Sequence, residues 1–317
     1  MTNTPKARQH TLAERIDLSG VGVHSGKPVS IALVPADADT GILFQRTDIP
    51  GEIDIPARAS KLCGTDLCTV LGDPAGAHVA TVEHLMAALL ALQVDNVIVE
   101  IDAAEVPVMD GSSEVFVRAI DAVGLRAQAS ARRFLRVKRE VRFDMGPSWG
   151  LFTPYDGQRF EVEIDFENPV IGRQRFASDV TPEVFRRDLS RARTFGFMND
   201  VEKLWAAGFA LGSSLENSVV ICKEDRIINP EGLRYADEFV RHKALDAVGD
   251  LALAGAPILG TFRSYRGGHK LNALALRELL ADADNFEWVD ATARSAGAAP
   301  RPELRAVSAP AYGADKR

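Results

Sequence analysis

The chain has 317 residues, of which 46% are hydrophobic and 26% charged, so it can bury a sizeable core and bulk disorder is excluded. At about 150 residues per domain, the length predicts two domains and excludes a single small stapled module. The net charge of −7 lacks the broad basic excess that sequence-independent phosphate binding needs, so we expect no nucleic acid partner.

The first half of the chain is expected to consist of short strands followed by a helix, a strand and a helix. Short β-rich runs separated by Gly, Pro and Asp predict strands at 29–35, 41–46, 52–57 and 67–72. Helical spacing follows at 81–93, then a strand at 96–102 and a helix at 112–124 that a serine caps. Residues 127–133 interrupt this pattern and are predicted to be a linker.

The second half repeats the order of strands before helices. Strands are predicted at 134–145, 149–154 and 158–166, and helices at 181–192, 200–208 and 238–255. Strand runs before helices indicate an α+β fold with antiparallel sheets, because a doubly wound parallel fold would alternate strand and helix throughout. We therefore predict two similar layered domains, at 1–126 and 133–291, that suggest a duplication, followed by a disordered tail at 292–317.

Cysteine usage and hydropathy indicate where the protein works. Cys63, Cys68 and Cys222 are too few and too unevenly spaced for a disulfide framework or a four-thiolate metal site. The sequence carries no secretory signal, and no apolar run approaches the ~18 residues of a membrane span. We expect a cytoplasmic protein without integral membrane association.

One polar stripe stands out on the predicted helix at 238–255. His242, Asp246 and Asp250 follow one another at four-residue intervals, so they lie on one helix face. Apolar residues fill the rest of the helix, and buried carboxylates need a cation, a metal or strong donors. A solvated face with salt bridges to Arg241 and Lys243 is an equally good interpretation of this segment alone.

Two further segments carry residues suited to proton transfer. Glu83 and His84 open the strongly apolar helix at 81–93, where His84 could bind a metal while Glu83 acts as a general base. His269 follows two glycines and precedes an apolar helix, and a neighbouring carboxylate such as Asp250 would hold it protonated. Helix capping by Glu83 and a solvent-exposed turn at His269 remain open for these segments.

The other histidines and one short loop give weaker signals. His10 is expected to be exposed to solvent and His78 to be structural. His24 lies in a glycine-rich turn that lacks the helix and the GK[ST] ending of a phosphate loop, so we expect a β-turn at the mouth of a site. Thr194 and Phe195 lie between predicted helices, where ordinary packing is the simplest explanation.

Taken together, His84, His242 and Asp246 would supply three ligands and leave a fourth position for water, as in catalytic zinc sites. Glu83 would then take the water proton, Lys243 or Thr194 would support an oxyanion, and His269 would protonate a departing amine. A His2Asp site also accommodates Fe²⁺, so zinc is a preference.

Five motifs occur in the order GVGVHSG, TVEH, ARTFGF, RHKALDAVGD and GGHKLN. Over roughly residues 8 to 288 this sequence closely resembles the UDP-3-O-acyl-N-acetylglucosamine deacetylases, zinc amidases of lipid A synthesis in Gram-negative bacteria. The resemblance implies two α+β domains whose sheets sandwich helices, a site at the domain junction, and a monomer that acts on UDP-3-O-(3-hydroxyacyl)-N-acetylglucosamine.

The resemblance also implies a role for each residue of the site. His84, His242 and Asp246 would be the zinc ligands, Glu83 the base, His269 the acid and Asp250 its partner. Thr194 would stabilise the oxyanion, Lys243 would meet the substrate near its diphosphate, Phe195 would line the site and His24 would lie beside the UDP-sugar. The passage for the acyl chain would comprise Met198, Val201, Leu215, Ser218 and Val220.

The sequence departs from the family where it carries Ser213 and Ser218 in place of the usual Gly and Ala, which leaves the acyl-chain length preference open. Cys68 would flank the site without being a ligand. Two other functions compete with the deacetylase: a non-catalytic module that binds UDP-sugars or acyl chains, and a dehydratase or amidase for another acylated sugar nucleotide. Glu83 and His269 argue against the module, because binding alone needs neither a base nor an acid.

Overall fold

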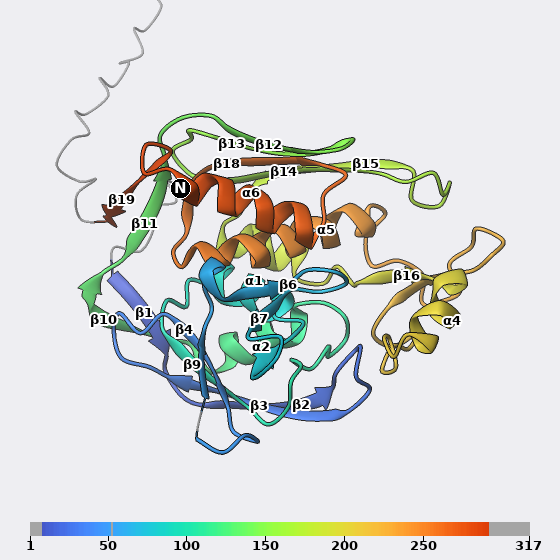
Figure 1. Cartoon of the computed structure of the whole chain (residues 1–317), viewed down its shortest axis with the longest axis horizontal. Coiled ribbons are helices and arrows are strands. Elements are labelled where there is room, and N and C mark those ends of the chain that lie inside the picture. Colours follow the sequence, from blue (N-terminus) through green and yellow to red (C-terminus); the bar gives the residue numbers. More distant parts are fainter. Residues whose placement is uncertain (1–7, 52, 292–317) are drawn as a thin grey trace, which may run out of the picture.

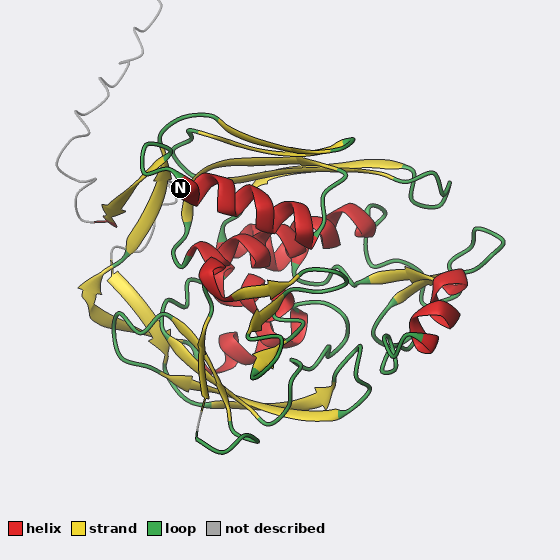
Figure 2. Ribbon diagram, in the orientation of Figure 1, coloured by secondary structure: helices red, strands yellow, loops and turns green. Residues whose placement is uncertain are grey.

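A computed structural model of the chain describes residues 8–51 and 53–291, so the tail predicted at 292–317 lies outside the described residues. Two large sheets form the outer layers, and the main helices lie between them (Figures 1 and 2). This arrangement confirms the predicted α+β fold with helices sandwiched between sheets. Of the helices in the described residues, none is long and apolar enough to cross a bilayer.

The sheet of the first half has the strand order β2-β3-β9-β4-β5 and lies at the bottom of Figure 1. Its strands are Ile16–Val21, Pro28–Pro35, Val97–Ile101, Ile42–Arg46 and Ile53–Pro56 in that order. β9 has the sequence VIVEI, in which alternate residues are buried, so one face packs against the helices. Four of these strands match predicted ones, whereas β2 was not predicted.

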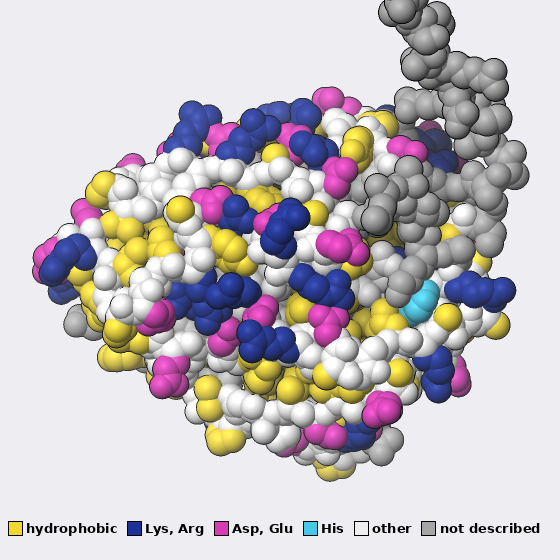
Figure 3. All heavy atoms as spheres, turned by 180° about the vertical axis from the view of Figure 1, so that it is seen from behind, with side chains coloured by type: hydrophobic (Ala, Val, Ile, Leu, Met, Phe, Trp, Pro, Cys, Tyr) yellow, Lys and Arg dark blue, Asp and Glu magenta, His cyan; other side chains and the backbone are white. Residues whose placement is uncertain are grey.

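The sheet of the second half lies at the top of Figure 1 and has seven strands. Five of them follow the order β12-β13-β18-β14-β15, with bounds Val141–Met145, Ser148–Thr153, Ile258–Tyr265, Gln158–Asp165 and Arg173–Asp179. β11 (Arg133–Val137) and β19 (Phe286–Asp290) complete it. Acidic and basic side chains are interspersed along its upper rim (Figure 3).

The two sheets share one topology. In each half two hairpins precede a helix, and the next strand enters the centre of the sheet, antiparallel to one hairpin and parallel to the other. The parallel pairs, β4 with β9 and β14 with β18, show that the prediction of antiparallel sheets was wrong: the sheets are mixed. The shared strand order supports the inference of a duplication.

Four helices fill the space between the sheets: α1 (Glu83–Ala91), α2 (Glu114–Val123), α5 (Glu238–Leu251) and α6 (His269–Ala281). α1 is buried on nearly all sides because its sequence, EHLMAALLA, is apolar beyond its first two residues. A serine cap was predicted for α2: the hydroxyl of Ser112 accepts from the Glu114 backbone nitrogen at 3.2 Å, whereas the hydroxyl of Ser113, the residue directly before the helix, accepts no hydrogen bond from it. The Ser113 hydroxyl donates instead to the carbonyl of His84 at 2.7 Å, which supports the start of α1.

The remaining elements are short. They are β1 (Arg8–Leu12), β6 (Leu62–Gly64), β7 (Val70–Gly72), β8 (His78–Val79), β10 (Leu125–Ala131), β16 (Phe195–Phe197), β17 (Val219–Ile221), α3 (Pro182–Val184), α4 (Met198–Ala206), 3-10 turns at Ala59–Lys61 and Ala252–Ala254, and a π-helical turn at Phe185–Leu189. α4 and β16 project to one side of the layers (Figure 1).

Two predictions about the junction of the halves were wrong. The stretch 127–133 is not a linker, because most of it forms β10, which pairs antiparallel with β1. His10 is buried in β1 rather than exposed, and its backbone nitrogen donates to Asp95 at 2.8 Å. The polar segment around His10 suggested solvation, but pairing of β1 with β10, 113 to 123 positions further along the chain, covers it.

α1 and α5, one from each half, lie in close contact. Gly249 of α5 lies against the backbone of α1, and a Cβ atom there would come within 2.0 Å of the Glu83 carbonyl oxygen. Only glycine allows two helix backbones to approach this closely. The contact fixes the spacing between the first turn of α1 and the middle of α5.

We expect Gly249→Ala to destabilise the protein by about 1–3 kcal/mol, because the added methyl must push the two helices apart. The sign of the change in unfolding free energy is diagnostic, since replacing glycine with alanine inside a helix otherwise stabilises a protein by about 1 kcal/mol. Thermal or urea unfolding measures the difference. Gly196→Ala is the control, because nothing lies within 4 Å of its Cβ position. Equal stability of G249A and wild type would contradict the proposed constraint.

Candidate metal centre and catalytic cavity

The contact between α1 and α5 gathers three ligand-type side chains. His84 of α1 and His242 and Asp246 of α5 are buried, and one donor atom of each lies within 4.8 Å of the others. Asp246 Oδ1 lies 3.6 Å from His84 Nε2 and 3.3 Å from His242 Nε2. The two imidazole rings stand nearly perpendicular, with centroids 5.0 Å apart. The structure thus brings together the three predicted ligands.

The protonation states in this cluster suit a cation. His242 Nδ1 lies 3.0 Å from the Ala192 carbonyl, which fixes the tautomer with Nε2 free to bind. Burial lowers the pKa of His242 to about 3, so the imidazole is neutral. Burial alone would raise the pKa of Asp246, but His242 and Lys243 hold it well below its ordinary value.

An orphaned oxygen tests whether the residues fit a metal. Asp246 is 1% exposed, and its Oδ1 has no hydrogen-bond donor within the described parts of the chain. A buried carboxylate oxygen without a partner costs free energy. Two neutral imidazoles and one carboxylate that converge on one point are a common donor set for a divalent transition metal. The cluster therefore fits a metal ion.

A carboxylate and a histidine face each other beside this cluster. Glu83 Oε1 lies 3.6 Å from His269 Nε2, and His269 Nδ1 lies 3.0 Å from Asp250 Oδ2. Burial raises the pKa of Glu83. Burial opposes the charged form of His269, but Asp250 and Glu83 outweigh it and raise the pKa of His269 to about 10. At neutral pH His269 is a cation able to give up a proton.

Thr69 connects the acid and the base, and the sequence did not single it out. Its backbone nitrogen donates to Glu83 Oε2 at 3.1 Å, and its hydroxyl donates to Asp250 Oδ1 at 2.5 Å. Asn272 donates to the other oxygen of Asp250 at 2.9 Å. Asp250 is thereby oriented toward His269 by two neutral donors. Thr69 directly precedes β7, and no local pattern in that segment indicates its distant partners.

A cavity of about 480 Å³ opens beside the metal cluster. Of the predicted site residues, the structure places nine on its wall with the three ligand-type residues: His24, Glu83, Thr194, Phe195, Val201, Ser218, Val220, Lys243 and His269. Asp250 lies behind His269. Met198 and Leu215 do not line this cavity and are partly exposed to solvent.

The cavity wall near the metal cluster carries a cation and an aromatic ring. The Lys243 ammonium donates to Asp246 Oδ2 at 2.9 Å and lies 5.5 Å from the centre of the Phe195 ring. Thr194 is anchored through its backbone, because its nitrogen donates to the Gly111 carbonyl and its carbonyl accepts from Val219. Its side chain is therefore held at the cavity by strand β16 and its neighbours.

A buried ion pair fixes the segment that carries Thr194. Arg193 is 1% exposed and Glu238 is 0% exposed, and their side chains are joined at 2.9 Å. The Arg193 backbone nitrogen also donates to Glu238, and the guanidinium donates to the Gly232 carbonyl. The pair ties the ARTF segment, whose Ala192 carbonyl holds His242, to the first turn of α5. Arg193 could not be recognised from the sequence, because a lone arginine is usually exposed.

The turn that carries His24 is organised by Glu105, another residue that the sequence did not indicate. Glu105 is buried and accepts from the backbone nitrogens of His24 and Ser25 at 2.8 and 2.9 Å. The His24 ring meets Phe209 edge to face, with centroids 5.7 Å apart. Burial lowers the pKa of His24, so its imidazole is neutral at the cavity.

The cysteine and the two serines noted in the sequence lie as follows. Cys68 is buried and does not line the cavity, and burial raises the pKa of its thiol to about 12. Ser213 and Ser218 both line the cavity, and their hydroxyl oxygens lie 3.2 Å apart. They place a polar pair on a wall that is otherwise rich in apolar side chains.

Comparison with known proteins gives a consistent result. The family model of UDP-3-O-acyl N-acetylglycosamine deacetylase matches residues 9–281. UDP-3-O-acyl-N-acetylglucosamine deacetylases of Brucella ovis (strain ATCC 25840 / 63/290 / NCTC 10512) and Brucella abortus (strain 2308) are 59% identical to the chain over 285 residues. The one from Brucella melitensis biotype 2 (strain ATCC 23457) has the same identity. Each alignment covers 90% of this chain and 99% of the relative.

We expect His84→Ala and Asp246→Ala to lose bound metal, because each removes one of three converging donors. The drop in affinity should exceed the roughly 10–100-fold that loss of an outer partner costs. Metal content of the purified variants, measured by atomic emission, checks this. His78→Ala is the matched control, since the His78 ring lies outside the cluster and its Nδ1 is 3.1 Å from the Gly76 carbonyl. Full metal content in H84A or D246A would rule out this ligand set.

Proposed function

The chain belongs to the UDP-3-O-acyl N-acetylglycosamine deacetylase family, and from this premise we propose that His84, His242 and Asp246 hold a zinc ion at its active site. The protein is a hydrolase of lipid A biosynthesis that removes the N-acetyl group from UDP-3-O-(3-hydroxyacyl)-N-acetylglucosamine, giving the free amine and acetate. The observation that carries the proposal is the buried three-donor cluster beside the Glu83 and His269 pair.

Glu83 is proposed as the general base. Its carboxylate lies in the cavity next to His84, and burial raises its pKa, which makes it a stronger proton acceptor than a solvated glutamate. Its other oxygen is held by the Thr69 backbone nitrogen, so Oε1 stays directed toward His269. Glu83 Oε1 would take one proton from the water that attacks the acetamide carbonyl.

His269 is proposed as the general acid. Because Asp250 holds Nδ1, the proton available to substrate is on Nε2, 3.6 Å from Glu83. With a pKa of about 10, His269 enters the reaction protonated. It would donate this proton to the sugar nitrogen as the C–N bond breaks, so one proton is taken from water and one is given to the leaving amine.

The remaining residues of the cavity are proposed to position the substrate. The Thr194 hydroxyl would stabilise negative charge on the carbonyl oxygen, and Lys243 would meet the diphosphate. Phe195 would line the site and His24 would lie beside the UDP-sugar. The acyl chain would follow Val201, Ser218 and Val220 and continue past Met198 and Leu215, whose partial exposure suits the far end of such a passage.

The family is one of metalloenzymes, and zinc is proposed from the resemblance to it, while the His2Asp donor set accommodates Fe²⁺ as well. When bound, the ion polarises the amide carbonyl and lowers the pKa of water. We further propose a cytoplasmic monomer with domains at 1–126 and 133–291. Net negative charge and the absence of a basic excess support a small-molecule substrate rather than nucleic acid.

Acetate release tests the proposed function directly. We expect the purified protein to release acetate from UDP-3-O-(3-hydroxymyristoyl)-N-acetylglucosamine, to lose turnover on chelation and to regain it on addition of zinc. Parallel addition of Fe²⁺ under anaerobic conditions compares the two metals. Absence of turnover in a protein that carries one zinc would contradict the proposed substrate, and full turnover after complete chelation would contradict the metal.

We expect Glu83→Gln to reduce kcat by roughly 10²–10⁴-fold, because glutamine keeps the shape of the side chain but cannot accept a proton. Bound zinc should remain, since Glu83 is not among the three donors. Acetate release and metal content are measured on the same sample. A variant with zinc and wild-type turnover would exclude Glu83 as the base, and it would favour a base elsewhere in the cavity.

A further inference from the structure

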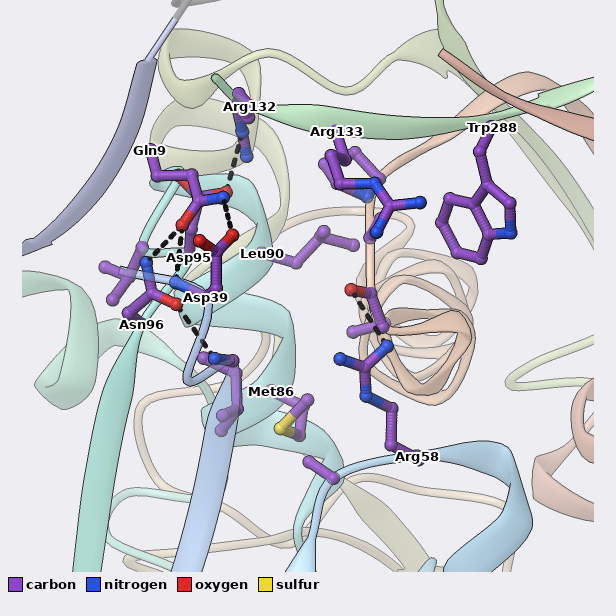
Figure 4. Close-up of a pocket in the computed structure, with 18 residues that line it drawn as sticks. Gln9, Asp39, Arg58, Met86, Leu90, Asp95, Asn96, Arg132, Arg133 and Trp288 are labelled. Atoms are coloured by element: carbon purple, nitrogen blue, oxygen red, sulfur yellow. Dashed lines mark hydrogen bonds and ion pairs between the residues drawn. The ribbon is translucent and has the colours of Figure 1, made fainter. Parts of the chain in front are cut away.

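A second cavity, of about 320 Å³, lies at the other end of α1 and shares no lining residue with the catalytic cavity. Figure 4 shows it between β1, β11, β19 and the segment that follows β5. Its size is at the lower limit of typical small-molecule pockets. The proposed function does not use it.

The floor of this cavity is apolar. It is lined by Met86 and Leu90 of α1, by Val94 after that helix, by Ile42 of β4 and by Pro257 just before β18. In Figure 4 Met86 and Leu90 lie between the polar groups on either side. An aliphatic chain of medium length would cover such a floor.

One side of the opening carries Arg58. Two glycines leave the space that its guanidinium occupies. A Cβ at Gly255 would come within 1.8 Å of the Arg58 guanidinium, and a Cβ at Gly41 within 3.5 Å. Gly41 and Gly255 both have positive φ, at 72° and 81°, which glycine adopts without strain. The guanidinium also donates to the Gly255 carbonyl at 3.4 Å. Its charge is therefore held at the cavity.

The opposite side carries Arg133 and Trp288 (Figure 4). The Arg133 guanidinium lies 5.0 Å from the Trp288 ring centre, and Trp288 is still 43% exposed. Within the described residues, neither Arg58 nor Arg133 forms an ion pair with a carboxylate. Two guanidiniums on facing sides of one opening can bind a carboxylate or a phosphate through charged hydrogen bonds.

The two aspartates that line the cavity, Asp39 and Asp95, accept hydrogen bonds from other side chains. Asp95 accepts from Arg132 at 2.7 Å, and Asp39 accepts from Gln9 and Ser130 at 2.7 and 3.0 Å. The hydrogen bonds from Gln9 and Ser130, and to a smaller extent the charge of Arg133, lower the pKa of Asp39. Both aspartates already accept strong hydrogen bonds, so Arg58 and Arg133 remain available to an outside anion.

We propose that this cavity binds an amphiphilic anion, a single carboxylate or phosphate on a medium-length aliphatic chain. The headgroup lies between Arg58 and Arg133 beside Trp288, and the chain lies over Met86 and Leu90. The proposal stands on the geometry of this cavity and is independent of the proposed catalytic function. α1 carries Glu83 and His84 at its start and lines this second cavity further along, so one helix contacts both sites.

Fluorescence of Trp288 reports on this cavity separately from the catalytic one. The full chain with Trp149→Phe and Trp205→Phe keeps Trp288 as its only tryptophan. It is titrated with decanoate, decyl phosphate, decanol and inorganic phosphate. Decanoate and decyl phosphate distinguish the two headgroups, while decanol lacks the charge and inorganic phosphate lacks the chain.

We expect saturable binding of decanoate or decyl phosphate that weakens about tenfold or more in R58Q/R133Q, since charged hydrogen bonds are lost. R173Q is the matched control, because Arg173 also lies over an aromatic ring that the probe protein keeps, Tyr265, at 5.9 Å but outside the cavity. Its affinity should not change. Circular dichroism checks folding, and R133Q alone serves if the double variant does not fold.

Three results would overturn the proposal. These are no saturable change with either anionic probe, equal affinity in wild type and the arginine variants, and decanol binding as tightly as the charged probes. A preference between decanoate and decyl phosphate would assign the headgroup and support the site.

Discussion

The chemistry of this protein depends on the close contact between α1 and α5 at Gly249. Because no side chain separates the two backbones there, Glu83 and His84 come within reach of His242, Asp246 and Asp250. A larger residue at position 249 would separate the metal ligands of one helix from the ligand of the other. The shared topology of the two halves explains why the contact is central: α1 and α5 occupy equivalent places in the two sheets and meet each other.

That contact creates a small volume in which several charges are buried together. Asp246 and Glu83 would be costly there alone. His242, Lys243 and His269 face them, and Thr69 and Asn272 donate to Asp250. The same arrangement sets the proton positions, since burial raises the pKa of Glu83 while Asp250 and Glu83 raise that of His269. Stability and acid–base function are therefore two results of one set of contacts.

Away from this centre, buried ion pairs hold the segments that complete the site. Arg193 and Glu238 fix the loop that presents Thr194 and the Ala192 carbonyl to α5. Arg132 and Asp95 fix the junction of the halves near the second cavity. Removing one member of such a pair leaves an uncompensated buried charge, which typically costs about 3–5 kcal/mol. These residues have no chemical role in the reaction, yet the geometry of both cavities depends on them.

Local sequence patterns determined much of this protein. Apolar periodicity placed α1, α5 and most strands of the two sheets, and the four-residue spacing of His242, Asp246 and Asp250 placed them on one helix face. Five short motifs, together with the resemblance they carry, indicated the metal ligands and the acid–base residues. These features can be predicted locally, because helix and strand periodicity depends on the spacing of apolar residues close together in the sequence.

Only the tertiary structure decided which distant segments meet. The hydroxyl of Thr69 reaches Asp250 across 181 positions of the chain, and β10 pairs with β1 where the sequence suggested a linker. The parallel pairs inside both sheets arise because β9 and β18 enter between hairpins formed earlier in the chain. Arg58, Arg133 and Trp288 surround one cavity although nothing in their own segments relates them. Such contacts depend on long-range packing, which leaves no periodic signal in the sequence.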